Sequence, residues 1–160
     1  MATQNLIQYL ETSGYNALPN PGGVVAVGAE AMNRRQIETF IASEAIVVGD
    51  TLALDFSKTA TGEKGIFVVK CDSGVATKKC GVGIAITAAA AGETVDAVIA
   101  GMVDNAKVAG ATAIGDAMAL SAATPGELAV YVNADVLPVF AIAATAHAGG
   151  TATVFVIKQM

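Results

Sequence analysis

The feature that most constrains the fold is a short pattern that occurs twice. The sequence GDTLAL at residues 49–54 is matched by GDAMAL at residues 115–120. Each copy is followed by a Gly-Glu pair, near residue 62 in the first case and near residue 126 in the second, and each pair leads into an apolar stretch. Repetition of the same short elements predicts two similar units built from short strands and glycine turns.

The downstream parts of the two copies also align. Residues 82–99 can be placed on residues 139–156 so that Gly92 falls on Gly149. Chance similarity in a chain rich in Ala and Gly is the alternative explanation for this match. The alignment predicts two quasi-repeated β units, at about 45–100 and about 111–158.

The alanine-rich run at residues 85–104, AITAAAAGETVDAVIAGMVD, could form either a helix or two strands, and the choice affects the whole fold. A helix through this run carries Gly92 in its interior, which costs about 1 kcal/mol relative to Ala. After the Gly-Glu pair, the segment TVDAVI places apolar residues on one face and Asp96 on the other, which is the period of a strand. We therefore expect two strands joined by a turn at Gly92, with a single helical turn over the alanines as the alternative.

The start of the chain has a different character from the rest. Residues 16–23, NALPNPGG, contain two Pro and two Gly, which favours an extended arm or linker over residues 1–23. Residues 24–160 then form the β domain, in which AIVVGDTLALD at 45–55 is expected to be a pair of strands around its Gly-Asp. The predicted fold is all-β, a small β-barrel or β-sandwich with an extended N-terminal arm.

Composition excludes several classes of function. Hydrophobic residues make up 54% of the chain, yet there is no Trp, and only three Tyr and five Phe. Small side chains of this kind suit tight β turns and close subunit contacts. The net charge of −5 opposes nucleic-acid binding, which needs a basic surface. Residues 136–157 are uncharged and long enough to span a membrane. Their weakly apolar centre and Pro138 argue against a span, so we expect no membrane partner.

No set of residues in the sequence points to catalysis. His147 is the single histidine and has no nucleophile or carboxylate beside it, so we expect a solvated turn residue. Cys71 and Cys80 are expected to be free thiols, with a disulfide as the alternative. A zinc site needs about four ligands, which this chain does not gather in sequence. We therefore expect no enzymatic activity, no cofactor and no metal site.

Several carboxylates lie beside glycines, an arrangement that calcium loops and tight turns share. No Asp-x-Asp-x-Asp-Gly pattern is present, and Asp side chains commonly accept hydrogen bonds from nearby backbone N–H groups in turns. We expect turn-forming roles rather than metal binding for these residues, which are Asp50, Glu63, Glu93, Asp116 and Glu127.

Four segments together resemble a known family. They are ASEAIVVGDTLALD, VGIAITAAAAGETVDAVIAGMV, TAIGDAMALSAATPGELA and TATVFVIKQ, and together they cover roughly residues 42–158 of the 160. In these segments the chain resembles the small capsid decoration, or cement, proteins of tailed bacteriophages. Other self-assembling virion components, such as tail or fibre proteins, and a small-molecule-binding β-barrel are the alternatives.

The resemblance implies a structural role on the outer surface of an icosahedral head, after assembly in the host cytoplasm. Such proteins bridge neighbouring major capsid protein subunits, as trimers more often than dimers. The N-terminal arm is suited to adding a strand to a neighbour, and Arg side chains are suited to binding carboxylates. A disordered tail and a solvated Arg pair are the alternatives. The expected partner-binding residues are Leu6, Ile7, Tyr9, Leu10, Tyr15, Arg34 and Arg35.

Overall fold

The computed structural model describes residues 35–132 and 138–157, and their regular structure consists almost entirely of strands. The all-β class is therefore confirmed. None of the helices in these two ranges is long and apolar enough to cross a membrane. The elements are β1 (Gln36–Ala42), β2 (Thr51–Leu54), α1 (Thr61–Lys64), β3 (Phe67–Lys70), the 3-10 turn η2 (Ala76–Lys78), β4 (Gly81–Ala85), β5 (Thr94–Val108), β6 (Ala117–Leu120), β7 (Leu128–Val130), β8 (Ala141–Ala143) and β9 (Gly150–Val156).

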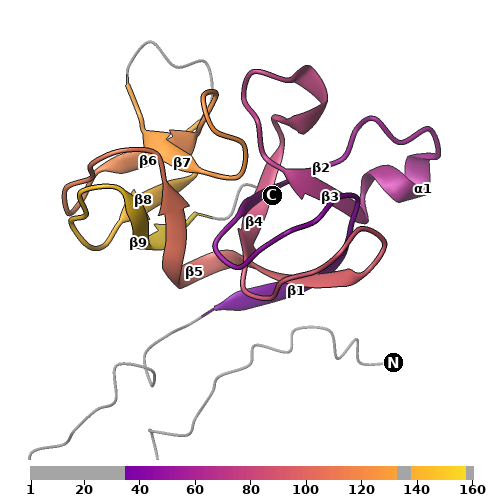
Figure 1. Ribbon diagram of the computed structural model, residues 1–160, viewed down its shortest axis with the longest axis horizontal. Helices are drawn as coiled ribbons and strands as arrows, with labels where there is room; N and C mark the ends of the chain where they lie inside the picture. The colour runs from indigo at the N-terminus through magenta and orange to yellow at the C-terminus, as the bar shows by residue number, and fades with distance from the viewer. Residues whose placement is uncertain (1–34, 133–137, 158–160) are drawn as a thin grey trace, which may run out of the picture.

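The strands belong to one mixed sheet in the order β1-β3-β2-β4-β5-β7-β6-β8-β9, with further pairings of β1 with β5 and of β5 with β9. The long strand β5 runs through both halves of the molecule (Figure 1). Its first part pairs with β1 and β4, and its second part pairs with β7 and β9. We call residues 36–100 the first unit and residues 101–156 the second unit.

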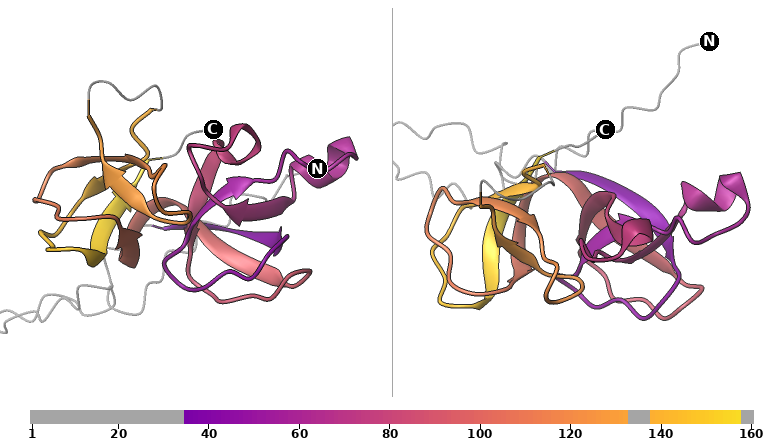
Figure 2. Two further views of the ribbon diagram at one scale, coloured as in Figure 1. Left: turned by 45° about the horizontal axis from the view of Figure 1, so that its top comes forward. Right: turned by 90° about the horizontal axis from the view of Figure 1, so that it is seen from above.

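The two units have the same pairing scheme. In the first unit β1 runs parallel to β3 and antiparallel to β5, while β2 is antiparallel to β3 and β4. In the second unit the later part of β5 runs parallel to β7 and antiparallel to β9, while β6 is antiparallel to β7 and β8. Each scheme forms a closed circuit of strands, and the two units lie side by side with β5 passing between them (Figure 2).

The Gly-Asp turns that begin the repeats are also alike in detail. Gly49 and Gly115 both have φ of 88°, a left-handed conformation that favours glycine. In the first turn the Asp50 carboxylate accepts a hydrogen bond from the Val47 N–H at 2.9 Å. In the second, the Asp116 carboxylate accepts one from the Ala113 N–H at 2.7 Å. The repeated dipeptide therefore marks the same turn twice.

The residues before the first Gly-Asp do not form the strand that the sequence suggested. Only Ile46 makes a β-bridge there, to Ala89, and residues 47–49 turn directly into β2. The expectation of a strand pair at 45–55 was therefore half wrong. The turn geometry is the reason, because Asp50 is hydrogen-bonded to Val47 through both its backbone N–H and its carboxylate.

The alanine-rich run forms two strands, as predicted, and not the helical alternative. β4 ends at Ala85, Gly92 lies in a turn with φ of 88°, and β5 begins at Thr94. The length of β5 was not anticipated. It continues through polar residues to Val108, with an irregular register around Asn105, whose φ is 62°.

Two hydrophobic clusters fill the units. One lies within the first unit and contains Phe40 and Leu52. The other lies in the second unit but also includes side chains of the first unit, among them Ile84 and Val98. The outward face of β4 and β5 in the first unit is thus buried by the second unit, and this contact fixes how the two units sit together.

Candidate functional site

Side chains that bind metal ions do not cluster in the described part of the chain. No group of three or more His, Cys, Asp or Glu side chains that could hold a metal ion occurs within residues 35–132 and 138–157. His147 is exposed, and its Nδ1 accepts a hydrogen bond from the Gly149 N–H at 2.9 Å. As expected, it is solvent-exposed and beside a turn, although its backbone forms a β-bridge with Thr112.

The carboxylates beside glycines mostly stabilise turns. Besides Asp50 and Asp116, the Glu93 carboxylate accepts a hydrogen bond from the Ala90 N–H at 2.8 Å. Glu63 lies in α1, and Glu127 precedes β7. The turn-forming role predicted from sequence is therefore confirmed for three of these residues, Asp50, Glu93 and Asp116.

The two cysteines are free thiols. Cys71 is buried and Cys80 is half-buried. Burial raises the pKa of the Cys71 thiol to about 12, from an ordinary value of 9.0. Because the thiolate is the reactive form, Cys71 is unreactive in the folded protein at neutral pH.

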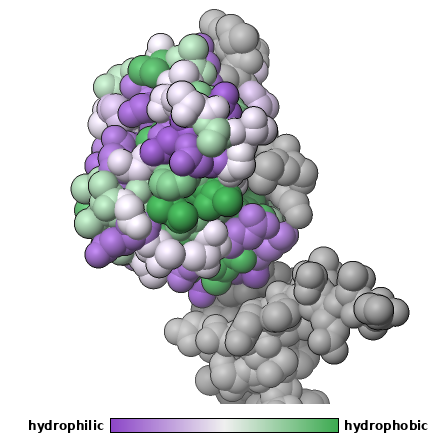
Figure 3. All heavy atoms as spheres, turned by 90° about the vertical axis from the view of Figure 1, so that its right-hand side faces the viewer, coloured by the Kyte–Doolittle hydropathy of each residue, from purple (hydrophilic) through white to green (hydrophobic). Residues whose placement is uncertain are grey.

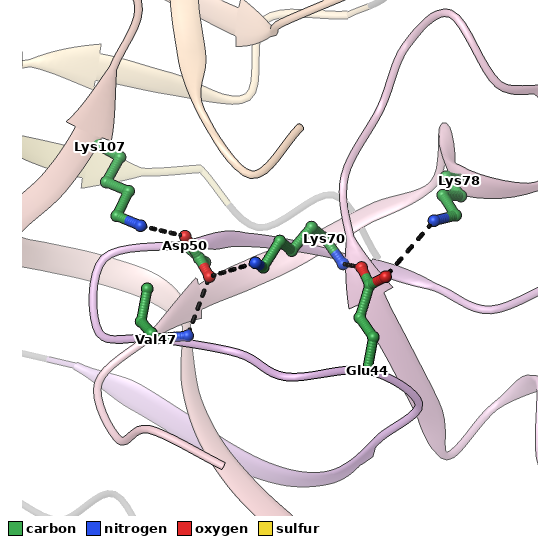
Figure 4. A network of polar contacts seen from close by, with 6 residues as sticks. All are labelled: Glu44, Val47, Asp50, Lys70, Lys78 and Lys107. Atoms are coloured by element: carbon green, nitrogen blue, oxygen red, sulfur yellow. Dashed lines mark hydrogen bonds and ion pairs between the residues drawn. The ribbon is translucent and has the colours of Figure 1, made fainter. Parts of the chain in front are cut away.

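A network of charged side chains joins the two units (Figure 4). The buried Asp50 of the first unit lies 2.7 Å from Nζ of Lys107, which belongs to the second unit. Its other carboxylate oxygen lies 3.7 Å from Nζ of Lys70. The network continues to Glu44, which accepts the Lys70 N–H at 2.8 Å and pairs with Lys78 at 3.7 Å. Each of these lysines has a carboxylate partner, and the Asp50–Lys107 pair is the one that crosses between the two units.

Exposed apolar side chains point to surfaces that could bind another protein. One set flanks α1, where Phe56 is 41% exposed and Ile66 is 49% exposed. Figure 3 looks at this end of the molecule and shows hydrophobic residues gathered within a largely polar face. We call Phe56 and Ile66 the α1-end patch. A patch with a polar rim is typical of protein–protein contacts.

A second set crosses the strands of the second unit. Phe155 of β9 lies opposite both Met102 of β5 and Ile142 of β8, and Ile142 lies opposite Ala117 of β6. Tyr131 is next in the row, since its N–H donates to the Ala117 carbonyl at 2.7 Å. We call these five residues the outer row. Phe155 is 46% exposed and Ile142 is 40% exposed.

Most partner-binding residues expected from sequence lie outside the described residues, namely Leu6, Ile7, Tyr9, Leu10, Tyr15 and Arg34. Arg35 lies directly before β1 and is half-buried. The exposed residues of the outer row were not identified from sequence. The available signal was one large apolar residue on the outward face of each strand, Ile142 of β8 and Phe155 of β9, because a strand needs apolar residues on both faces only if both become covered.

Comparison with known proteins finds a likeness in fold. Neither a protein-family model nor a curated protein sequence matches this chain. A similar solved structure is the crystal structure of the head fiber gp8.5 N base in bacteriophage phi29. It matches with a TM-score of 0.54 at 14% identity, covering 76% of this chain and 92% of that one. At this identity the two proteins share a fold.

Proposed function

We propose that this protein is a structural component of a tailed-phage virion that decorates the outer surface of the head and bridges neighbouring major capsid subunits. The observation that supports this most strongly is the fold shared with a phage head fiber base, which extends over 76% of this chain. The sequence segments that resemble cement proteins cover the same β domain.

The surface properties support a binding role rather than catalysis. The described residues place apolar side chains on exposed strand faces, whereas the buried Asp50 carboxylate is paired with two lysines. A protein added in many copies to a regular shell also gains avidity when it is itself oligomeric, without any new contact. Self-association is accordingly part of the proposal.

The N-terminal arm is proposed to contact the shell. An extended segment adds affinity by pairing its backbone with an open sheet edge of a neighbour. Deleting residues 1–20 should leave the β domain folded, by circular dichroism, but weaken binding to shells in co-sedimentation. Unchanged shell binding by the truncated chain would contradict a role for the arm.

A second candidate function is the base of a head fiber. The likeness to gp8.5 favours it, because that protein is itself a head fiber base. A fiber base differs from a cement protein in number, since a cement protein must occupy the seams between subunits over the whole shell.

Counting copies per particle tests the proposal and separates the two candidates. Particles from the source system are banded on a density gradient and their proteins quantified by mass spectrometry. A copy number close to that of the major shell subunit supports cementing. A markedly lower number of copies on the head indicates a fiber base. If the 15.9 kDa chain stays in the soluble fractions, the virion role is refuted.

A further inference from the structure

The outer row has a counterpart in the first unit. Matching the strand pairings of the two units relates Phe155 to Val98 and Ile142 to Ile84, because Ile84 and Val98 lie opposite each other on β4 and β5. The match extends along the row: the Cys71 N–H donates to the Thr51 carbonyl at 2.9 Å, as the Tyr131 N–H does to Ala117. The counterpart row is Ile37, Val98, Ile84, Thr51 and Cys71.

Of these two rows, the counterpart row is covered at every position except Ile37, which is 46% exposed. Ile84, Val98, Thr51 and Cys71 all have an exposed fraction of 0%, because the second unit packs over them. Phe155 and Ile142 occupy the corresponding places in the second unit and remain exposed. The chain thus contains one complete junction between units. The outer row is the exposed surface that would form one side of a second junction of the same kind.

The surface that covers the first row belongs to the loop between β6 and β7 and the strands beside it. The Gly126 carbonyl accepts the Thr51 N–H at 2.8 Å, and the Ser121 carbonyl accepts the Ser73 N–H at 3.1 Å. Side chains of Leu120 and Phe140 lie against Gly81, where an added Cβ would approach Phe140 within 2.8 Å. This covering surface is therefore mainly apolar and includes a turn.

The equivalent surface of the first unit is the α1 end, where no residue of α1 is buried within residues 35–132 and 138–157. The loop between β2 and β3 corresponds to the loop between β6 and β7, and it carries α1 together with Phe56 and Ile66. This second exposed surface is apolar too. One chain thus exposes, at opposite ends, the two kinds of surface that its own units bring together at their junction.

The charged residues beside the two surfaces differ in how they are paired. Asp50 is paired with Lys107 and Lys70 at the junction, whereas its counterpart Asp116 forms no ion pair within residues 35–132 and 138–157. The α1 end carries Lys58 and Lys64 together with Glu63, so lysines are present there that Asp116 of another copy could meet. An ion pair across a contact favours one orientation of docking.

We propose that the outer row of one copy binds the α1-end patch of a second copy of this chain, in the way the first unit binds the second. Such a contact joins two different surfaces, so it builds closed rings or open filaments rather than a face-to-face dimer. The inference deepens the self-association in the proposed function, but it does not depend on which shell the protein binds.

Two variants and their mixture test the proposal by size-exclusion chromatography with light scattering. Ile142→Asp alters the outer row, and Ile66→Asp alters the α1-end patch. Both side chains are substantially exposed, at 40% and 49%, so both variants should fold, as circular dichroism checks. Ile114→Asp is the matched control, because Ile114 is 73% exposed in a turn outside both surfaces.

The wild type and the control are expected to form oligomers, and each of the other two variants is expected to be monomeric. An equimolar mixture of the two should form one-to-one dimers and nothing larger, because a single intact pair of surfaces remains. Oligomers unaffected by either substitution, or a mixture that stays monomeric, would overturn the proposal. A wild type that is monomeric in solution yet abundant on particles would overturn it while leaving the virion role intact.

Discussion

Ile84 and Ile142 occupy the same place in two copies of one strand arrangement, yet one is buried and the other is 40% exposed. The difference does not come from the strands, whose pairings are the same. It comes from the neighbouring structure: the first unit has the second unit beside it, and no third unit lies beside the second within residues 35–132 and 138–157. Whether this isoleucine is buried therefore depends on whether another unit packs against its strand. An exposed apolar residue at this position indicates a surface that another unit could cover.

The largest effect should come from the glycines of the two turns. A Cβ on Gly49 would lie 2.2 Å from the Asn105 carbonyl oxygen, whereas one on Gly115 would meet nothing within 4 Å. Both positions have a positive φ, which costs a side chain about 1–2 kcal/mol. We expect Gly115→Ala to cost that much and Gly49→Ala about 3–5 kcal/mol, because the backbone must also shift. Thermal unfolding measures both, and equal losses would mean that the junction does not hold the first turn.

The next largest difference is expected between Ile84 and Ile142. Truncating the buried Ile84 to Ala should cost about 2–5 kcal/mol, the usual range for a large-to-small core substitution. Ile142→Ala should cost less than about 1 kcal/mol in the monomer. Denaturation in the Ile66→Asp background makes this comparison without self-association. Similar losses at the two positions would show that the outer row is already covered within the chain.

A smaller difference is expected between the two aspartates. Asp50→Asn leaves Lys107 and Lys70 without their partner, but both lysine side chains are about a third exposed, at 32% and 31%, so solvent screens the loss. We expect a cost of about 2 kcal/mol, and less than about 1 kcal/mol for Asp116→Asn, whose amide oxygen still accepts the turn hydrogen bond. Urea midpoints compare the two variants. A larger loss of stability for Asp116→Asn than for Asp50→Asn would contradict a stabilising role for the Asp50 ion pairs at the junction.

The smallest expected effect is a difference in chemical labelling between Cys71 and Cys80. Cys71 belongs to the covered row, and burial raises its pKa to about 12, so a thiol reagent at pH 8.5 should modify Cys80 at least about tenfold faster. The raised pKa contributes stability that is fully present below pH 9 and is lost as pH rises toward about 12. Gly49→Ala, which loosens the junction, should speed the labelling of Cys71 more than Gly115→Ala does. Equal labelling of the two cysteines in the wild type would contradict burial of the row.

The elements with local signals were predictable from sequence. The Gly-Asp turns and the turn at Gly92 follow from glycine conformations and nearby carboxylates. The whole of β5 did not follow, because Asp104 and Asn105 interrupt its apolar pattern at the irregular register. Arg35 shows why the partner-binding residues were harder to predict. From sequence alone, a cation that binds a partner looks the same as a half-buried arginine before a strand. The outer row was missed because alternation places apolar residues on a face without saying whether another unit covers it.

The most direct test of the account is whether position 142 of one copy meets position 66 of another. Chains carrying Ile142→Cys and chains carrying Ile66→Cys, each with Cys80→Ser to remove the half-buried thiol, are mixed and mildly oxidised. The account predicts a disulfide between the two different chains, identified by mass spectrometry of the linked peptides. Disulfides that join position 142 only to position 142, or none above the level seen with Ile114→Cys, would contradict it.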